Sequence, residues 1–210
     1  MIVRSIAAPA AAAALALAAP ALHAEDSMLD MLVAVLTAQA ADGVAGIERQ
    51  LESLDPALRK AAAPIVAGLI VDSRDEALAR GVEAVPDGIR AEIEGYVPDA
   101  VLDRVRWCAG CGGALSLQAS AFRLGYAPAI TLDYVVVFES RSVALTDPSL
   151  WVHELKHVMQ YEEWGVEEFA SRYVEDYAAV EREAAEYRWE WVKRTDWLER
   201  RKSRLVGSVP

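Results

Sequence analysis

Residues 147–165 read DPSLWVHELKHVMQYEEWG, and they contain the pattern H-E-x-x-H at residues 153–157. On a helix, His153 and His157 lie one turn apart on the same face, where both imidazoles can bind one zinc ion. Glu154 lies near that face, where its carboxylate can reach a zinc-bound water and act as a general base. The stretch therefore predicts a zinc site with its own base.

Both ends of this stretch carry helix boundary signals. Asp147 is a favourable N-cap residue, Pro148 suits the first helical position, and Gly165 can end the helix in a left-handed conformation. We predict a helix of about four turns between them. The alternative interpretation is a pair of histidines held by hydrogen bonds on a partly buried helix face.

The residues before this helix show the two-residue period that is typical of β-strands. Segments 101–107 and 114–122 alternate apolar and polar residues, and segment 130–138 is rich in β-branched and aromatic types. Turn residues at 125–128 separate the last two segments, so we expect a small antiparallel sheet. An edge strand of such a sheet could bind an extended peptide beside the metal.

The two cysteines, Cys108 and Cys111, lie between the first two predicted strands. In an exported protein, cysteines this close are expected to form a local disulfide. A redox-active pair is less favoured, because no helix N-terminus is predicted behind the first cysteine to lower its pKa. A structural zinc site with both histidines of the motif is also less favoured, because the spacing is far from that of zinc fingers.

A catalytic zinc usually has three protein ligands and a water, so a third ligand is expected after the motif. Segments 167–177 and 180–204 both have helical patterns, and Glu181 opens the second of them. One intervening helix could turn the chain back, so a glutamate there could complete a His₂Glu site.

The C-terminal helical segment also carries aromatic and basic residues. Trp189, Trp191 and Trp197 lie near two groups of Lys and Arg, as in helices that bind anionic membrane surfaces. Acidic residues interleave the basic ones, so we favour tryptophans that cover the zinc-site helix and charges that are solvated.

The N-terminal half is expected to be structural. Residues 1–24 resemble a secretory signal peptide, with cleavage after Ala24 or at the small residues 19–21. An uncleaved anchor is less favoured, because the apolar run contains prolines and is shorter than the roughly 20 residues of a membrane span. Segments 27–41, 46–53, 56–72, 74–84 and 89–95 have helical patterns without clustered catalytic residue types.

Composition limits the function classes. The chain has 210 residues, 54% of them hydrophobic, with 21 Lys and Arg against 32 Asp and Glu, for a net charge of −11. A chain of this length can bury a core, and its acidity argues against nucleic acid binding. The patterns together predict a mainly helical α+β fold, with N-terminal helices, a small antiparallel sheet, the H-E-x-x-H helix and C-terminal helices.

The run HELKHVMQYEEWGVEEFASRYVEDYAAVEREA, which begins at residue 153, resembles zinc metallopeptidases of the bacterial eCIS-core family. This family is named for its occurrence with extracellular contractile injection systems. The upstream runs DGIRAEIEGYVPDAVLDRVRW and AITLDYVVVF are also similar to the family, so the resemblance covers about residues 85–190. It implies a zincin-like domain, placed at 85–210, and it does not cover the signal peptide at 1–24 and the helical region at 25–84 that the sequence pattern predicts.

The resemblance also implies a ligand set. His153 and His157 would bind one zinc ion per chain, with Glu154 as the general base. The later family motif, Glu-x-x-Ala-Asp, makes Glu181 the third ligand; Glu183 is the alternative. Ala185 stands where the family has an acid that would orient a histidine, and such partners commonly contribute 10–100-fold to affinity or activity.

We therefore expect an exported, periplasmic or extracellular zinc metallopeptidase that acts on a peptide or protein substrate. Tyr173 and Tyr177 are the nearest phenols that could donate a hydrogen bond to the oxyanion, although either could instead pack in the core. The alternative function is a non-catalytic, zinc-stabilised binding or scaffold module of the cell envelope or a secretion system. Glu154 favours the enzyme, and the missing acid at residue 185 favours the module.

Overall fold

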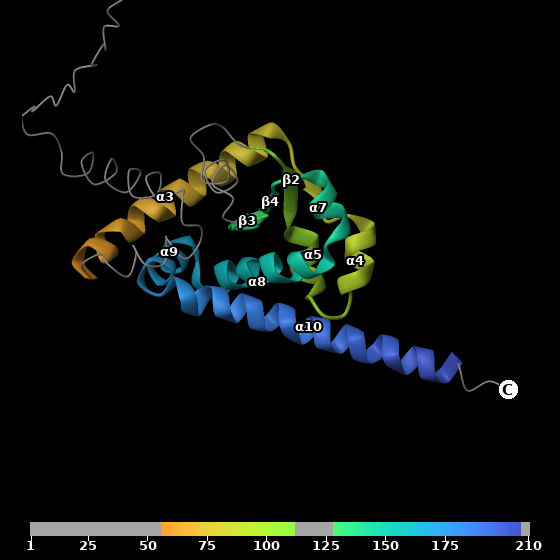
Figure 1. Cartoon of the computed structure of the whole chain (residues 1–210). Coiled ribbons are helices and arrows are strands. Elements are labelled where there is room, and N and C mark those ends of the chain that lie inside the picture. Colours follow the sequence, from red (N-terminus) through yellow and green to blue (C-terminus); the bar gives the residue numbers. More distant parts are fainter. Residues whose placement is uncertain (1–55, 112–127, 207–210) are drawn as a thin grey trace, which may run out of the picture.

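The computed structural model describes residues 56–111 and 128–206, and Figure 1 shows the arrangement of their helices and strands. The helices are α3 (Pro56–Arg80), α4 (Asp87–Ile93), α5 (Asp99–Arg104), α7 (Arg141–Thr146), α8 (Pro148–Trp164), α9 (Val166–Glu175) and α10 (Tyr177–Val206). The strands are β1 (Glu83–Ala84), β2 (Arg106–Ala109), β3 (Ala129–Leu132) and β4 (Val135–Phe138). The predicted mainly helical α+β class is confirmed. The expected signal peptide, the helices at 27–41 and 46–53, and the strand at 114–122 lie outside the described residues.

The sheet has the strand order β1-β2-β4-β3 and is mixed rather than wholly antiparallel as predicted. β1 and β3 pair antiparallel with their neighbours, whereas β2 and β4 run parallel. Segment 130–138 was expected to form one strand, but it folds into the β3–β4 hairpin because Asp133 adopts a φ of 58° in the turn. Aspartate tolerates this left-handed conformation better than most residues.

β4 is one of the two central strands, and its four residues are buried on both faces of the sheet. Val136 and Phe138 belong to the core that includes α8, whereas Val135 and Val137 pack with residues of α3. This explains why β4 lacks the polar alternation of a strand with one solvated face. In Figure 1 the sheet accordingly lies between α3 and α8.

The register of the hairpin directs one polar side chain toward the zinc-motif helix. Thr131 of β3 pairs with Val136 of β4, so its side chain lies on the same face as Val136, toward α8. Thr131 is 7% exposed. The sheet thus supplies a hydroxyl at the buried side of α8.

The strand predicted at 101–107 is wrong for its first half. Residues 99–104 form α5, which follows Pro98 at its N-cap and has Asp99 in its first turn. Val101 and Leu102 are adjacent and both buried in the core, which breaks the two-residue period of a strand with one solvated face, and Pro98 and Asp99 are signals of a helix start. β2 begins only at Arg106.

The helices predicted at 56–72 and 74–84 form one continuous helix, α3. Ser73, at the expected break, is buried at 4% exposure and does not interrupt the helix. α3 ends at Arg80, one residue before Gly81, whose φ of 100° suits a helix terminus. Residues 83–84, expected to be helical, form β1 instead.

Cys108 and Cys111 form the predicted disulfide, with their Cα atoms 6.0 Å apart. Cys108 lies in β2 itself rather than between two strands as expected. It packs with Leu132, Val135 and Val137, on the α3 side of the sheet. The disulfide is therefore on the face of the sheet opposite α8.

α10 packs along α8 and α9 and then continues past the other elements toward the C-terminus (Figure 1). Trp191 is buried in the core beside α8, whereas Trp189 is 60% exposed. The side chain of Trp197 lies outside the described part of the chain. No helix among the described residues combines the length and apolarity needed to span a membrane.

Candidate metal site

The helix predicted from its boundary signals is confirmed as α8. The Asp147 side chain accepts a hydrogen bond from the backbone N–H of Leu150 at 2.9 Å, and Pro148 occupies the first turn. Gly165 ends α8 with φ 78° and ψ 167°, a combination that is nearly restricted to glycine. α8 therefore carries the H-E-x-x-H pattern as a regular helix, with one flank against the sheet and another against α10.

His153, His157 and Glu181 form one group at the contact between α8 and α10. The Nε2 atoms of His153 and His157 are 3.2 Å apart, and they lie 3.2 Å and 3.4 Å from the two carboxylate oxygens of Glu181. The ligand atoms of all three residues lie within 4.8 Å of one another. Two residues from α8 and one from α10 could therefore hold a metal ion together.

The electrostatics of this group keep Glu181 ionised. Burial raises the pKa of Glu181, but hydrogen bonds and charge interactions with His153 and His157 outweigh burial and lower it to about 2. Burial lowers the pKa of His157, but its hydrogen bond to Glu181 and the charge of Glu181 outweigh burial and raise it. A metal cation would replace the proton that this cluster attracts.

The donor set suits zinc. Two imidazole nitrogens and one carboxylate oxygen are the protein ligands of a catalytic His₂Glu zinc site, which keeps a fourth position for water. The side chain of His157 is only 7% exposed, whereas those of His153 and Glu181 are 17% and 25% exposed. The group is thus buried on the His157 side and accessible on the other, as a site that admits water requires.

Glu154 lies beside this group but points toward the sheet. It is 5% exposed, and its Oε2 accepts a hydrogen bond from the Thr131 hydroxyl at 2.7 Å. The same hydroxyl lies 3.2 Å from the main-chain oxygen of Glu154. A buried carboxylate that is held at one oxygen is a suitable proton acceptor.

Glu183, the alternative ligand, lies outside the group. Its Oε1 is 2.7 Å from Lys156 Nζ, and its Oε2 accepts a hydrogen bond from Gln160 Nε2 at 2.7 Å. Burial raises the pKa of Glu183, but Lys156 and Gln160 outweigh burial and lower it. Both oxygens of Glu183 therefore have partners from α8 other than the two histidines.

The two candidate phenols differ in position. The Tyr173 hydroxyl donates to Glu181 Oε1 at 3.5 Å, and burial, with the nearby charge of Glu181, raises the pKa of Tyr173 well above its usual value. Tyr177 packs edge-to-face against the Tyr173 ring, with the centroids 4.8 Å apart. Among these two phenols, the structure brings Tyr173 to a residue of the group.

Two residues of the site, Gln160 and Thr131, were missed by the sequence analysis. Gln160 Oε1 lies 2.8 Å from His157 Nδ1, and Gln160 Nε2 donates to the Val180 carbonyl at 3.2 Å. Gln160 lies one turn after His157 on the predicted helix, where its polar side chain has no evident contact with solvent. This position was the sign in the sequence that Gln160 could contact His157. Thr131 gave no signal, because its contact with Glu154 depends on the hairpin register.

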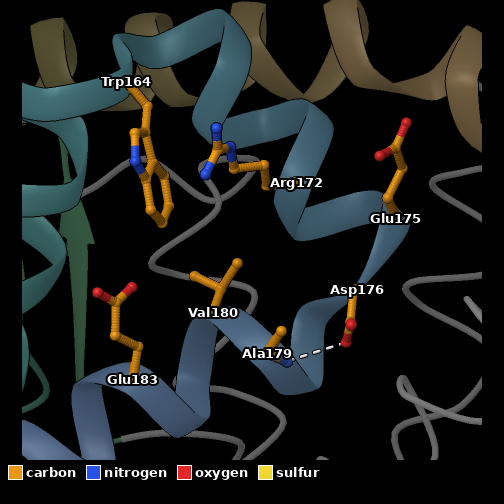
Figure 2. Close-up of a pocket in the computed structure, with 7 residues that line it drawn as sticks. All are labelled: Trp164, Arg172, Glu175, Asp176, Ala179, Val180 and Glu183. Atoms are coloured by element: carbon orange, nitrogen blue, oxygen red, sulfur yellow. Dashed lines mark hydrogen bonds between the residues drawn. The ribbon is translucent and has the colours of Figure 1, made fainter.

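A cavity of about 240 Å³ lies next to these contacts, and Figure 2 shows Val180 and Glu183 among the residues that line it. The cavity is bounded by the end of α8, the end of α9 and the first turns of α10. It is lined by Trp164, Arg172, Glu175, Asp176, Ala179, Val180 and Glu183. The contacts that start at His157 thus reach the wall of a surface cavity at Glu183.

Comparison with known proteins gives one result. Residues 84–165, from β1 to the end of α8, match the family model of the eCIS core domain. The resemblance to the eCIS core domain is thereby confirmed for this segment, which contains H-E-x-x-H but stops before Glu181. No match was found among curated proteins, and none among solved structures.

Proposed function

We propose that this chain is an exported zinc metallopeptidase whose zinc is held by His153, His157 and Glu181. The observation that carries the proposal is the convergence of these three side chains within 4.8 Å, beside a buried carboxylate. A purely structural zinc site has no use for such a carboxylate, because it is closed by four protein ligands.

The chemistry follows from the positions of the side chains. When bound, zinc supplies a Lewis acid that polarises a peptide carbonyl and makes water acidic near neutral pH. Glu154 accepts a hydrogen bond from Thr131 at Oε2, and its other oxygen would take the proton of a water and pass it to the leaving amine. Tyr173 is a neutral, partly buried phenol beside Glu181, and it is our candidate hydrogen-bond donor to the oxyanion.

A peptide substrate is supported by the arrangement of the sheet. β3 ends the strand order among the described strands and packs against α8. An extended peptide can add to such a strand through main-chain hydrogen bonds, which places its carbonyl groups beside the H-E-x-x-H helix. We propose that substrates bind there as extended segments.

Export is proposed from two features. The first 24 residues have the composition of a secretory signal peptide, and the Cys108–Cys111 disulfide suits an oxidising compartment. The proposed location is the periplasm or the extracellular space.

The direct test is hydrolysis of a mixed peptide library by the zinc-loaded protein, followed by mass spectrometry. Wild-type protein is expected to produce defined cleavages, and Glu154→Gln is expected to cleave about 10²–10⁴-fold more slowly while it still binds zinc. Equal cleavage by the two proteins would refute the role of Glu154. A zinc-loaded wild type that cleaves nothing would instead favour the zinc-stabilised scaffold module.

A further inference from the structure

Gln160 is the most completely buried polar side chain near the metal group. Its exposure is 0%, so each polar atom of its carboxamide must find a partner inside the protein. The contacts lie on two sides: Oε1 faces His157 of the same helix, and Nε2 faces α10. Such burial of an amide is unfavourable unless its hydrogen bonds are made.

The partners on the α10 side fix which way the amide points. The Val180 carbonyl and the Glu183 carboxylate are both acceptors, at 3.2 Å and 2.7 Å from the Gln160 nitrogen. A flipped amide would bring its oxygen against these two acceptors and lose both hydrogen bonds. The NH₂ group must therefore face α10, and Oε1 must face His157.

This orientation selects one tautomer of His157. Gln160 Oε1 is only an acceptor, so the neutral His157 ring must carry its proton on Nδ1, 2.8 Å away. The lone pair is then on Nε2, the atom that lies 3.2 Å from His153 Nε2 and 3.4 Å from Glu181 Oε1. The ring is held with its metal-binding nitrogen toward the group.

The other end of the amide acts on the helix that carries the third ligand. Val180 and Glu183 lie on either side of Glu181 along α10, and both accept from Gln160. The family resemblance places an orienting acid at residue 185. Ala185 is exposed, so it does not share the buried position of Gln160. One side chain thus contacts a histidine of α8 and both flanks of Glu181.

We propose that Gln160 is a positioning residue that fixes the Nδ1–H tautomer of His157 and anchors the Glu181 segment of α10, so that zinc meets a preformed ligand set. Partners of this kind are commonly worth 10–100-fold in metal affinity. The zinc part of this inference rests on the proposed function, whereas the tautomer part concerns the metal-free protein alone.

The test compares Gln160→Met, which keeps the side-chain length but removes both hydrogen bonds, with Lys156→Met. The control removes another α8–α10 contact, the ion pair with Glu183, without touching His157. Long-range ¹H–¹⁵N spectra of the metal-free full chain, recorded where His157 is neutral, should show Nδ1–H in wild type and in Lys156→Met. In Gln160→Met the ring should shift toward Nε2–H or a mixture.

Zinc affinity, measured with a competing chelator, is the second readout. We expect a loss of about 10–100-fold in Gln160→Met and a loss of less than about threefold in Lys156→Met. An unchanged tautomer in Gln160→Met, or equal zinc affinity in both variants, would overturn the proposal. A wild type that binds no zinc would refute the proposed function, and the tautomer spectra would still decide the role of Gln160 at His157.

Gln160→Glu keeps the test valid if Gln160→Met fails to fold, as judged by far-UV circular dichroism. This variant retains an acceptor toward His157, and in its ionised form it cannot donate to Val180 and Glu183. It should keep the Nδ1–H tautomer while its zinc affinity falls. Loss of that tautomer in a folded Gln160→Glu protein would contradict the proposal.

Discussion

Thr131 and Glu154 make the contact that best shows how single side chains define this site. Glu154 was predicted as the base because it stands between two spaced histidines, a pattern that sequence alone reveals. Thr131, which donates to it at 2.7 Å, comes from a strand whose register no local pattern specifies. The sequence thus identifies the candidate base, whereas the side chain that holds it depends on tertiary contacts.

Thr131→Val should destabilise the protein, because it removes the donor to a buried carboxylate while it keeps the side-chain shape. We expect the free energy of unfolding, measured with urea, to fall by about 1–3 kcal/mol. Thr131→Ser is the matched control, since it retains the hydroxyl and should lose less. Equal stability of the two variants would show that the hydroxyl has no energetic role.

The His157–Glu181 contact should make the stability of the metal-free protein depend on pH. The pKa of His157 is higher in the folded protein than its usual value of 6.5, so His157 stabilises the fold at pH values below 6.5. This contribution is lost as the pH rises through the folded-state pKa. The pKa of Glu181 is lower in the folded protein than its usual value of 4.5, so Glu181 stabilises the fold at pH values above 4.5. This contribution is lost as the pH falls toward about 2. Both contributions are therefore present together between about pH 4.5 and 6.5.

Glu181→Gln should remove this dependence. The difference in Tm between wild type and the variant, with a chelator present, should be larger at pH 5.5 than at pH 8.5. The same difference at both pH values would contradict the assigned ion pair.

At the scale of elements, helices with clear ends could be predicted and short elements could not. α8 follows from Asp147, Pro148 and Gly165, which specify its ends locally. α5 and the β3–β4 hairpin were misassigned because each has only a few residues, so burial in the core outweighs their periodicity. Helix order predicts that a glutamate near residue 181 returns to the motif, but the position of Glu181 in the group, with Glu183 outside it, depends on the packing of α10 on α8.

Gly165→Ala should be costly, because the φ of 78° and ψ of 167° between α8 and α9 are strained for any residue with a Cβ. We expect a loss of about 1–3 kcal/mol in the free energy of unfolding. Gly88→Ala is the control: Gly88 lies in α4, has no positive φ, and a Cβ there meets no atom within 4 Å. Equal unfolding midpoints for the two variants would contradict this account of the α8–α9 junction.

At the scale of the molecule, the sheet separates two regions with different roles. The α8 face holds the candidate metal site, whereas the α3 face holds the Cys108–Cys111 disulfide. The overall α+β class could be predicted from patterning, but the parallel pairing of β2 with β4 could not, because it joins segments far apart in the chain. The division predicts that stability and metal binding can be changed independently.

The double variant Cys108→Ser, Cys111→Ser should lower stability without changing zinc binding. The disulfide closes a short loop, so its removal should cost about 2 kcal/mol in the free energy of unfolding. Zinc content of the folded fraction should equal that of wild type. A loss of zinc from a variant that remains folded would show that the two faces are coupled.

The central claim is that α8 and α10 together hold one zinc ion, and elemental analysis of the purified, zinc-reconstituted chain tests it most directly. Wild type, Glu154→Gln and Glu183→Ala should each retain about one zinc per chain, as expected for a single site. Glu181→Ala should lose most of its zinc under the same dialysis. A wild type without zinc, or a Glu181→Ala protein with as much zinc as wild type, would contradict the claim.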